Sequence, residues 1–129
     1  MTRNEFADML QTLARAWTAR DYEKAIGFFA DNIRYGDPLH YSFSNCTDLL
    51  RFFQDDGGYE QSTVWHNILF DEEQQLGAAE YSYRGTYLYH GLVLIKVQGD
   101  KIIRWREYQH ISEVEWERFT AGTAFEPVR

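Results

Sequence analysis

Glu107 is the acidic residue whose position in the sequence points most directly to chemistry. It lies in residues 101–111, where side chains alternate as they do along a β-strand with one covered face. One face carries Ile103, Trp105, Glu107 and Gln109, and the other carries Ile102, Arg104, Arg106, Tyr108 and His110. The arginines mark their face as the wetter one, so Trp105 and Glu107 are predicted to point toward the helices. A covered carboxylate is costly unless it is neutral or paired, so Glu107 is either an acid–base group or the ion-pair partner of an arginine such as Arg84.

Other reactive residue types do not form a recognisable pattern. The histidines, at positions 40, 66, 90 and 110, lack the short spacing of metal ligands, so no metal site is predicted. The glycines are isolated or in turns, which argues against a phosphate-binding loop and a nucleotide cofactor. The single cysteine, Cys46, has no basic sequence neighbour that would activate it as a nucleophile. We therefore expect chemistry without metal or cofactor.

Length and composition predict one globular domain covering residues 1–129. Apolar residues make up 44% of the chain and charged residues 26%, which is ordinary for such a domain. Aromatic residues reach 17%, with 4 Trp, 9 Tyr and 9 Phe. Large rings dominate hydrophobic cores and also line concave apolar sites, so the composition is compatible with either use.

The net charge of −7 argues against nucleic acid as a partner, because phosphate binding needs a basic face. No basic run favours a membrane surface, and no apolar run is long enough for a membrane span or a signal peptide. A lone cysteine cannot form an internal disulfide, which favours a reducing compartment. We therefore expect a cytoplasmic protein with no nucleic-acid or membrane partner.

The first half of the chain carries helical signals. Apolar residues at helical spacing predict a helix over about residues 4–19, with Asn4 or Thr2 as its cap. A second helix is predicted from an Asp21 cap to about residue 30, followed by a short strand at 33–35 and a loop at 39–46. Thr47 or Asn45 can cap a third helix, which Gly57 and Gly58 would end.

The second half reads as a strand meander over about residues 62–71, 76–86, 89–98 and 101–111. Short connections make these strands antiparallel, and helices followed by a meander predict an α+β fold with helices on one face of the sheet. The inward faces of strands 62–71 and 76–86 stay open. Strand 89–98 is apolar on both faces, so a second copy of the sheet is expected to cover Leu92 or Leu94 in a homodimer.

Three stretches carry a resemblance to a known family. They are residues 21–26 (DYEKAI), 31–38 (DNIRYGDP) and 99–108 (GDKIIRWREY). With the order of elements, they resemble the nuclear transport factor 2-like superfamily, in particular its SnoaL-like polyketide-cyclase and ketosteroid-isomerase branch, over about residues 4–112. This resemblance implies a curved, mostly antiparallel sheet, a cone-shaped half-barrel, with about three helices on its concave face around a small-molecule pocket.

The resemblance also implies site residues. Asp37, before Pro38, matches the catalytic base of the ketosteroid-isomerase branch, although Asp-Pro is also ordinary turn chemistry. The oxyanion-stabilising Tyr and Asp of that branch are replaced here by about Leu13 and Val93, which disfavours steroid isomerisation. His66 matches the proton-shuttling His of dehydratase- and cyclase-like relatives, and alternatively it is a hydrogen-bonded strand residue.

Two functions remain open at this point. One is a cofactor-free acid–base enzyme of the isomerase, cyclase or dehydratase type, acting on a small apolar or cyclic molecule. Its proton-transferring residues would be Asp37, Glu107 and His66, and its substrate-binding residues would be Trp17, Trp105, Tyr81 and His40. The alternative is a non-catalytic ligand-binding or dimeric assembly module of the same fold. Convergence of Asp37 and Glu107 on one cavity would favour the enzyme.

Overall fold

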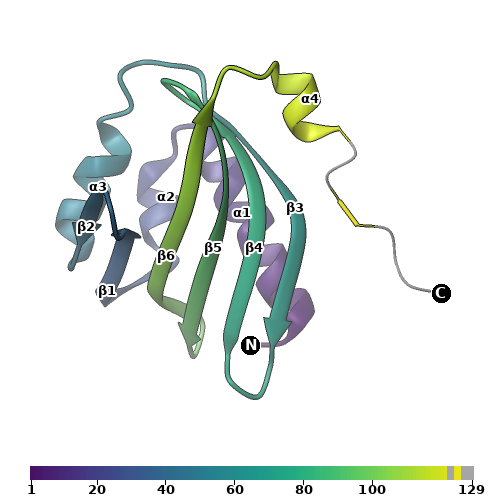
Figure 1. The fold of residues 1–129 in the computed structure, drawn as a ribbon. Helices are drawn as coiled ribbons and strands as arrows, with labels where there is room; N and C mark the ends of the chain where they lie inside the picture. The colour runs from purple at the N-terminus through teal and green to yellow at the C-terminus, as the bar shows by residue number, and fades with distance from the viewer. Residues whose placement is uncertain (122–123, 126–129) are drawn as a thin grey trace.

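The computed structural model describes residues 1–121 and 124–125, and within them the chain forms an α+β fold (Figure 1). In the described residues the helices are α1 (Arg3–Thr18), α2 (Tyr22–Ile26), α3 (Cys46–Gln54) and α4 (Trp116–Thr120). The strands are β1 (Phe29–Asp37), β2 (Tyr41–Phe43), β3 (Ser62–Asp71), β4 (Leu76–Arg84), β5 (Leu88–Gln98) and β6 (Lys101–Ser112). The four strands of the meander and the first helix lie where the sequence predicts them.

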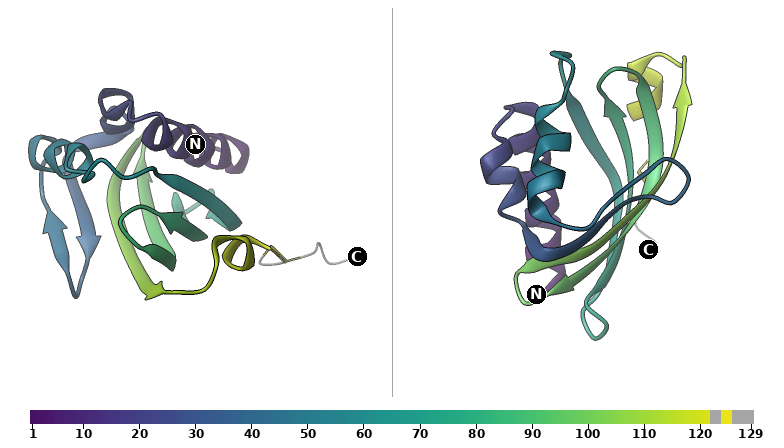
Figure 2. Two further views of the ribbon diagram at one scale, coloured as in Figure 1. Left: turned by 90° about the horizontal axis from the view of Figure 1, so that it is seen from above. Right: turned by 90° about the vertical axis from the view of Figure 1, so that its left-hand side faces the viewer.

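One curved sheet organises the molecule, with the strand order β2-β1-β6-β5-β4-β3. Neighbouring strands are antiparallel except β1 and β6, which run parallel. Helices α1, α2 and α3 cover the concave face, and α4 lies on the convex side (Figure 2). The predicted half-barrel with about three helices on its concave face is therefore confirmed.

Local sequence signals set the helix starts. Thr2 and Glu5 form a reciprocal capping box at the start of α1, and the side chains of Asp21 and Asn45 cap α2 and α3. Each cap satisfies a backbone N–H that the first turn of a helix leaves without a partner. The buried side of α1 then packs on the sheet, where Phe6 stacks on Phe70 of β3.

Two predictions about the first half are wrong. The second helix ends at Ile26, not near residue 30, because Phe29 pairs with Ile102 of β6 and is buried as the first residue of β1. The predicted loop at 39–46 contains β2, which pairs with β1 as a short hairpin. In both segments, pairing with distant or neighbouring strands overrides the local signal.

The register of β6 also differs from strict alternation at one residue. A bulge pairs Lys96 with Arg104 and Val97 with Ile102, so Ile103 has no partner on β5. Ile102 is consequently fully buried, whereas the alternation predicted Ile103 on the covered face. Beyond the bulge, Trp105 and Glu107 point to the concave side as predicted, and both are buried.

The faces that the sequence left open are now assigned. On β4, Ala79 and Tyr81 are buried under the helices. On β3, Trp65 is buried and its indole N–H donates to the Leu10 carbonyl of α1 at 2.9 Å. A bulge between Trp65 and Asn67 displaces His66 from the regular alternation.

No helix among the described residues is long and apolar enough to cross a membrane.

Candidate functional site

A cavity of about 280 Å³ lies between the concave face and the helices. Its walls are mostly aromatic. They come from α1, α2, α3 and all six strands, with β3 contributing Thr63 and Trp65 from its first half. The aromatic lining residues are Trp17, Tyr22, Tyr35, Tyr41, Phe52, Phe53, Trp65, Tyr81, Tyr83, Tyr89 and Trp105. The polar ones are Asp55, Asp56, Gln61, Thr63, Thr86, Glu107 and Gln109. Four residues predicted for the site, Trp17, Tyr81, Trp105 and Glu107, are therefore together in one cavity.

Glu107 lies in this wall with only 6% of its surface exposed. Its Oε1 accepts a hydrogen bond from the Trp105 indole N–H at 2.9 Å, and its Oε2 lies 2.9 Å from the Tyr81 hydroxyl. The Tyr35 and Tyr41 side chains also line the cavity near this carboxylate. The carboxylate thus sits among one indole and three phenols.

The pKa of Glu107 is raised by its burial, which penalises the charged form more than its hydrogen bonds favour it. Burial, followed by the charge of Glu107, also raises the pKa of Tyr35, Tyr41 and Tyr81, so these phenols keep their protons. The arrangement offers a carboxyl group of tunable charge beside fixed hydroxyl donors. Such a group is suited to accepting and returning a proton.

The alternative of an Arg84–Glu107 ion pair is wrong. The Arg84 guanidinium instead lies 4.9 Å from the centre of the Trp116 ring, a cation–π contact with α4. Among the described residues, no ion pair to Glu107 is present, and no Lys, Arg or His lines the cavity. Glu107 is stabilised by hydrogen bonds alone.

Aromatic rings in the cavity wall pack against one another both face to face and edge to face. The Trp105 ring stacks on Tyr35 at 5.4 Å and meets Trp17 at 5.8 Å and an interplanar angle of 86°. Within the described part of the chain, the Trp17 indole N–H is buried and has no hydrogen-bond partner, and the same holds for the Thr63 hydroxyl. Buried polar groups normally find partners, so these two are available for contact with a ligand.

The rim of the cavity is acidic. Asp55 is exposed, and Asp56 accepts hydrogen bonds from the Tyr22 hydroxyl and the Gly58 N–H. These bonds, led by that of Tyr22, lower the pKa of Asp56, which therefore stays ionised. Gln61 completes the cluster by donating to the Tyr22 hydroxyl at 2.9 Å.

Asp37 does not line this cavity. It ends β1 with 3% of its surface exposed, and its Oδ1 accepts from the Leu39 N–H at 2.9 Å while its Oδ2 lies 3.0 Å from Nδ1 of His40. This is the geometry of a turn-forming Asp before Pro38. Asp37 lines a separate hollow that shares Tyr35, Tyr41 and Trp105 with the cavity, so the structure does not bring it to one cavity with Glu107.

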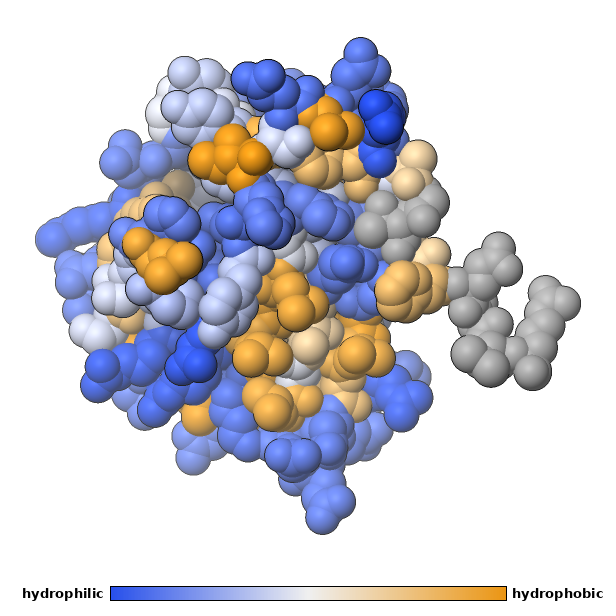
Figure 3. Space-filling view, in the orientation of Figure 1, coloured by the Kyte–Doolittle hydropathy of each residue, from blue (hydrophilic) through white to orange (hydrophobic). Residues whose placement is uncertain are grey.

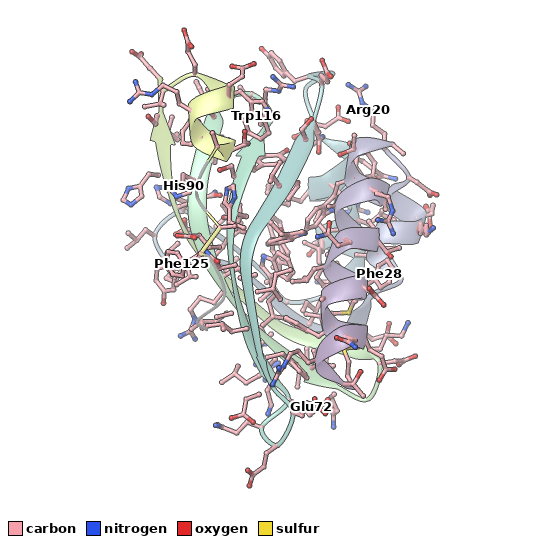
Figure 4. All side chains as sticks on the ribbon, turned by 90° about the vertical axis from the view of Figure 1, so that its right-hand side faces the viewer. Arg20, Phe28, Glu72, His90, Trp116 and Phe125 are labelled. Carbon is pink, nitrogen blue, oxygen red and sulfur yellow. The ribbon has the colours of Figure 1, made fainter. Side chains whose placement is uncertain are left out.

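His66 and His40 also lie outside the cavity. His66 Nε2 is 2.8 Å from the Ser82 hydroxyl, which is 3.1 Å from Nδ1 of His90 and donates to the Phe119 carbonyl. This cluster lies on the convex side beneath α4, where Figure 4 shows His90 across the sheet from α1. Burial lowers the pKa of His66. The bulge in β3 accounts for its position.

Sequence reasoning did not single out Tyr35 and Tyr41. Tyr35 lies two residues before Asp37 in a predicted strand, so alternation could have placed it on one face with that residue. Tyr41 fell in a predicted loop, and no local signal marks it. Within the described residues, no cluster of His, Cys, Asp and Glu is arranged to bind a metal ion.

No protein-family model and no curated protein sequence matches this chain. Solved structures do match. An LEH-like epoxide hydrolase from M. tuberculosis superimposes with a TM-score of 0.74 at 13% identity, covering 84% of each chain. An NTF2-like protein of unknown function from Cytophaga hutchinsonii gives a TM-score of 0.69 at 10% identity, covering 81% of this chain and 88% of the other.

The chain has the nuclear transport factor 2-like fold. A hypothetical protein with a ketosteroid isomerase-like fold from Catenulispora acidiphila, in complex with trimethylamine, also matches it, with a TM-score of 0.67 at 14% identity over 78% of this chain and 83% of the other. At these identities the likeness is one of fold. Proteins with the NTF2-like fold differ in activity, so function has to be argued from the residues in the cavity.

The raised pKa of Glu107 has a measurable consequence for stability. A group that is protonated more readily when folded stabilises the fold at low pH, and this contribution is lost as pH rises through the folded-state pKa. Relative to Glu107→Gln, the wild type should lose up to about 1.4 kcal/mol of unfolding free energy per pH unit from the ordinary glutamate range upward.

Urea unfolding of both proteins at a series of pH values measures this difference. Glu113→Gln, which removes an exposed glutamate, is unfolded alongside as the control for a surface substitution. A wild-type-minus-Glu107→Gln difference that stays constant or grows with pH would contradict a raised pKa.

Proposed function

We propose that this protein binds a small, largely apolar or cyclic molecule in the aromatic cavity and that Glu107 transfers a proton on it. The observation that supports this most directly is a buried carboxyl group, without a cationic partner, in the wall of an open aromatic cavity. Perturbed carboxyl groups in such cavities are the usual means of acid–base catalysis. The epoxide hydrolase and the trimethylamine complex of the same fold also support a small-molecule role.

The reaction would be of the isomerase, cyclase or dehydratase type. Glu107 would take a proton from one atom of the bound molecule, and the resulting carboxylic acid would return a proton to another atom. The transfer is redox-neutral, so it needs no cofactor. Tyr81, which lies 2.9 Å from the Glu107 carboxylate and 2.8 Å from the side-chain oxygen of Gln109, would compensate the changing charge through its hydroxyl.

Proton transfer is assigned to Glu107 in preference to Asp37, His66 and His40. Asp37 and His66 both have hydrogen-bond partners outside the cavity, and the His40 side chain is 62% exposed. Asp37 instead fixes the turn between β1 and β2, and this turn carries Tyr41 to the carboxylate. Its contribution would be to positioning.

A second candidate is a binding module without chemistry. Two observations favour it: Asp37 does not share the cavity with Glu107, and the Glu107 carboxylate accepts hydrogen bonds from Trp105 and Tyr81 within the protein, as a structural carboxylate would. In that case Glu107 fixes the shape of the cavity and the ligand is only held there.

Hydrogen–deuterium exchange at carbon separates the two candidates. Cyclohexanone, 2-cyclohexenone and 1-indanone are incubated with the protein in D2O, and loss of their α-proton signals is followed by NMR. The enzyme model predicts faster exchange for at least one ketone, and Glu107→Gln should slow it by at least about 100-fold. Asp37→Asn keeps the oxygen that forms the turn and should exchange at nearly the wild-type rate.

Two results would contradict the enzyme model. In the first, a ketone binds and shifts cavity resonances such as the Trp17 indole signal, but every ketone tested exchanges its α-protons at the rate measured in buffer. The other is exchange that survives in Glu107→Gln but is lost in Asp37→Asn. The first result favours the binding module, and the second returns catalysis to Asp37.

We also propose that two copies associate through the convex face of the sheet. Leu92 and Leu94 of β5 are 45% and 39% exposed, and Tyr108 beside Leu92 is 47% exposed. Figure 3 shows apolar side chains gathered on this face. Adjacent exposed apolar residues on a sheet are typical of a protein interface.

The lone Cys46 supports a reducing compartment such as the cytoplasm.

Sedimentation at micromolar concentration should give about twice the chain mass of 15.3 kDa. Leu94→Glu should shift the population to monomer, because it places two like charges in the symmetric contact. Leu39→Glu changes an equally apolar, 84% exposed residue outside this face and serves as the control. A clean wild-type monomer would rule out the dimer.

A further inference from the structure

Of the three carboxyl groups that line the cavity, those of Glu107 and Asp55 have no cationic partner among the described residues. Glu107 lies in the wall and Asp55 and Asp56 lie at the rim. Arg20 is 3.6 Å from Asp56 but does not line the cavity, and no other ion pair in the described residues involves these carboxylates. A carboxylate that is removed from water is normally paired with a cation. Here no Lys, Arg or His of the described residues lines the cavity.

The remaining lining favours a cation over an anion. Trp65 meets Trp105 at 6.3 Å and 71°, and it meets Tyr81 at 5.6 Å and 70°. With Trp17, which is nearly perpendicular to Trp105, these rings form walls at steep angles to one another. The face of an aromatic ring is electron-rich and attracts a positive group, most strongly when that group is a weakly hydrated alkylated nitrogen.

Hydrogen bonds connect two of these rings to the Glu107 carboxylate. Trp105 and Tyr81 both hydrogen-bond Glu107 through their edges, at 2.9 Å each, so their ring positions are fixed relative to the charge. A cation in the cavity would therefore meet ring faces and the carboxylate together. A neutral molecule would leave Glu107 without an opposite charge, and an anion would be repelled by it.

We propose that the ligand of this cavity is an apolar ring or chain that carries a positively charged nitrogen, with the aromatic walls holding the nitrogen and Glu107 acting as its counter-ion. This names the substrate class of the proposed function and rests on it for any chemistry. As a statement about binding, it can be tested without turnover.

The positive nitrogen would also prepare Glu107 for proton transfer. A nearby positive charge favours the ionised form of a carboxyl group, so binding would convert Glu107 to the form that accepts a proton.

An isosteric pair of probes isolates the charge. (4-Hydroxyphenyl)trimethylammonium and 4-tert-butylphenol have nearly the same shape and differ in one positive charge. The wild type should bind the ammonium compound at least about tenfold more tightly, measured by tryptophan fluorescence or NMR titration. Glu107→Gln should reduce this ratio to near one and leave the affinity for 4-tert-butylphenol within about twofold, which shows that the variant cavity is intact.

Asp55→Asn and Asp56→Asn serve as matched variants, since they remove rim carboxylates one at a time. They should lower the ratio less than Glu107→Gln does, because rim charges are screened by water. The proposal is overturned if 4-tert-butylphenol binds the wild type as tightly as the ammonium compound, if Glu107→Gln keeps the preference, or if neither probe binds. None of these results would change the ketone exchange assay, so the proposed function stands or falls separately.

Discussion

The burial of the Glu107 carboxylate without a cation is the constraint on which the rest of the site depends. A carboxyl group at this depth is tolerated only if polar groups surround it. Tyr81 on β4 and Trp105 on β6 itself donate hydrogen bonds to it, and Tyr35 on β1 and Tyr41 on β2 lie near it. The β1–β2 hairpin, whose turn is fixed by Asp37, places Tyr35 and Tyr41 near the Glu107 carboxyl group of β6. The order of the strands and the identity of the aromatic residues are therefore linked through one side chain.

The same donors that stabilise the carboxylate also form the cavity. The sheet is curved, and α1 and α3 lie over its concave face, where these residues line the cavity (Figure 2). On β5, Val93 pairs with Glu107 across the strands and is fully buried. The carboxyl group of the cavity thus lies on β6, directly across from Val93, the position at which the resemblance implies an Asp.

The sequence was informative where a regular pattern decides orientation and silent where tertiary contacts do. Alternation along β6 predicted that Trp105 and Glu107 face the helices, because one face of that strand is clearly wetter. It could not predict the bulges that bury Ile102 and turn His66 to the convex side, since a bulge is set by pairing with the neighbouring strand. Tyr41 was unpredictable for the same reason. Asp37 was singled out by resemblance, but hydrogen bonds within its own turn hold its carboxylate there.

Burial inside an aromatic cavity raises the pKa of Glu107. The most direct measurement is an NMR titration of the side-chain carboxyl carbons in protein labelled with ¹³C-glutamate, with the Glu107 resonance assigned by its absence from Glu107→Gln. Glu107 should titrate above the exposed glutamates, and Tyr81→Phe should move its pKa still higher, because a donor to the charged form has been removed. A Glu107 resonance that titrates with the exposed glutamates or below them would contradict the account.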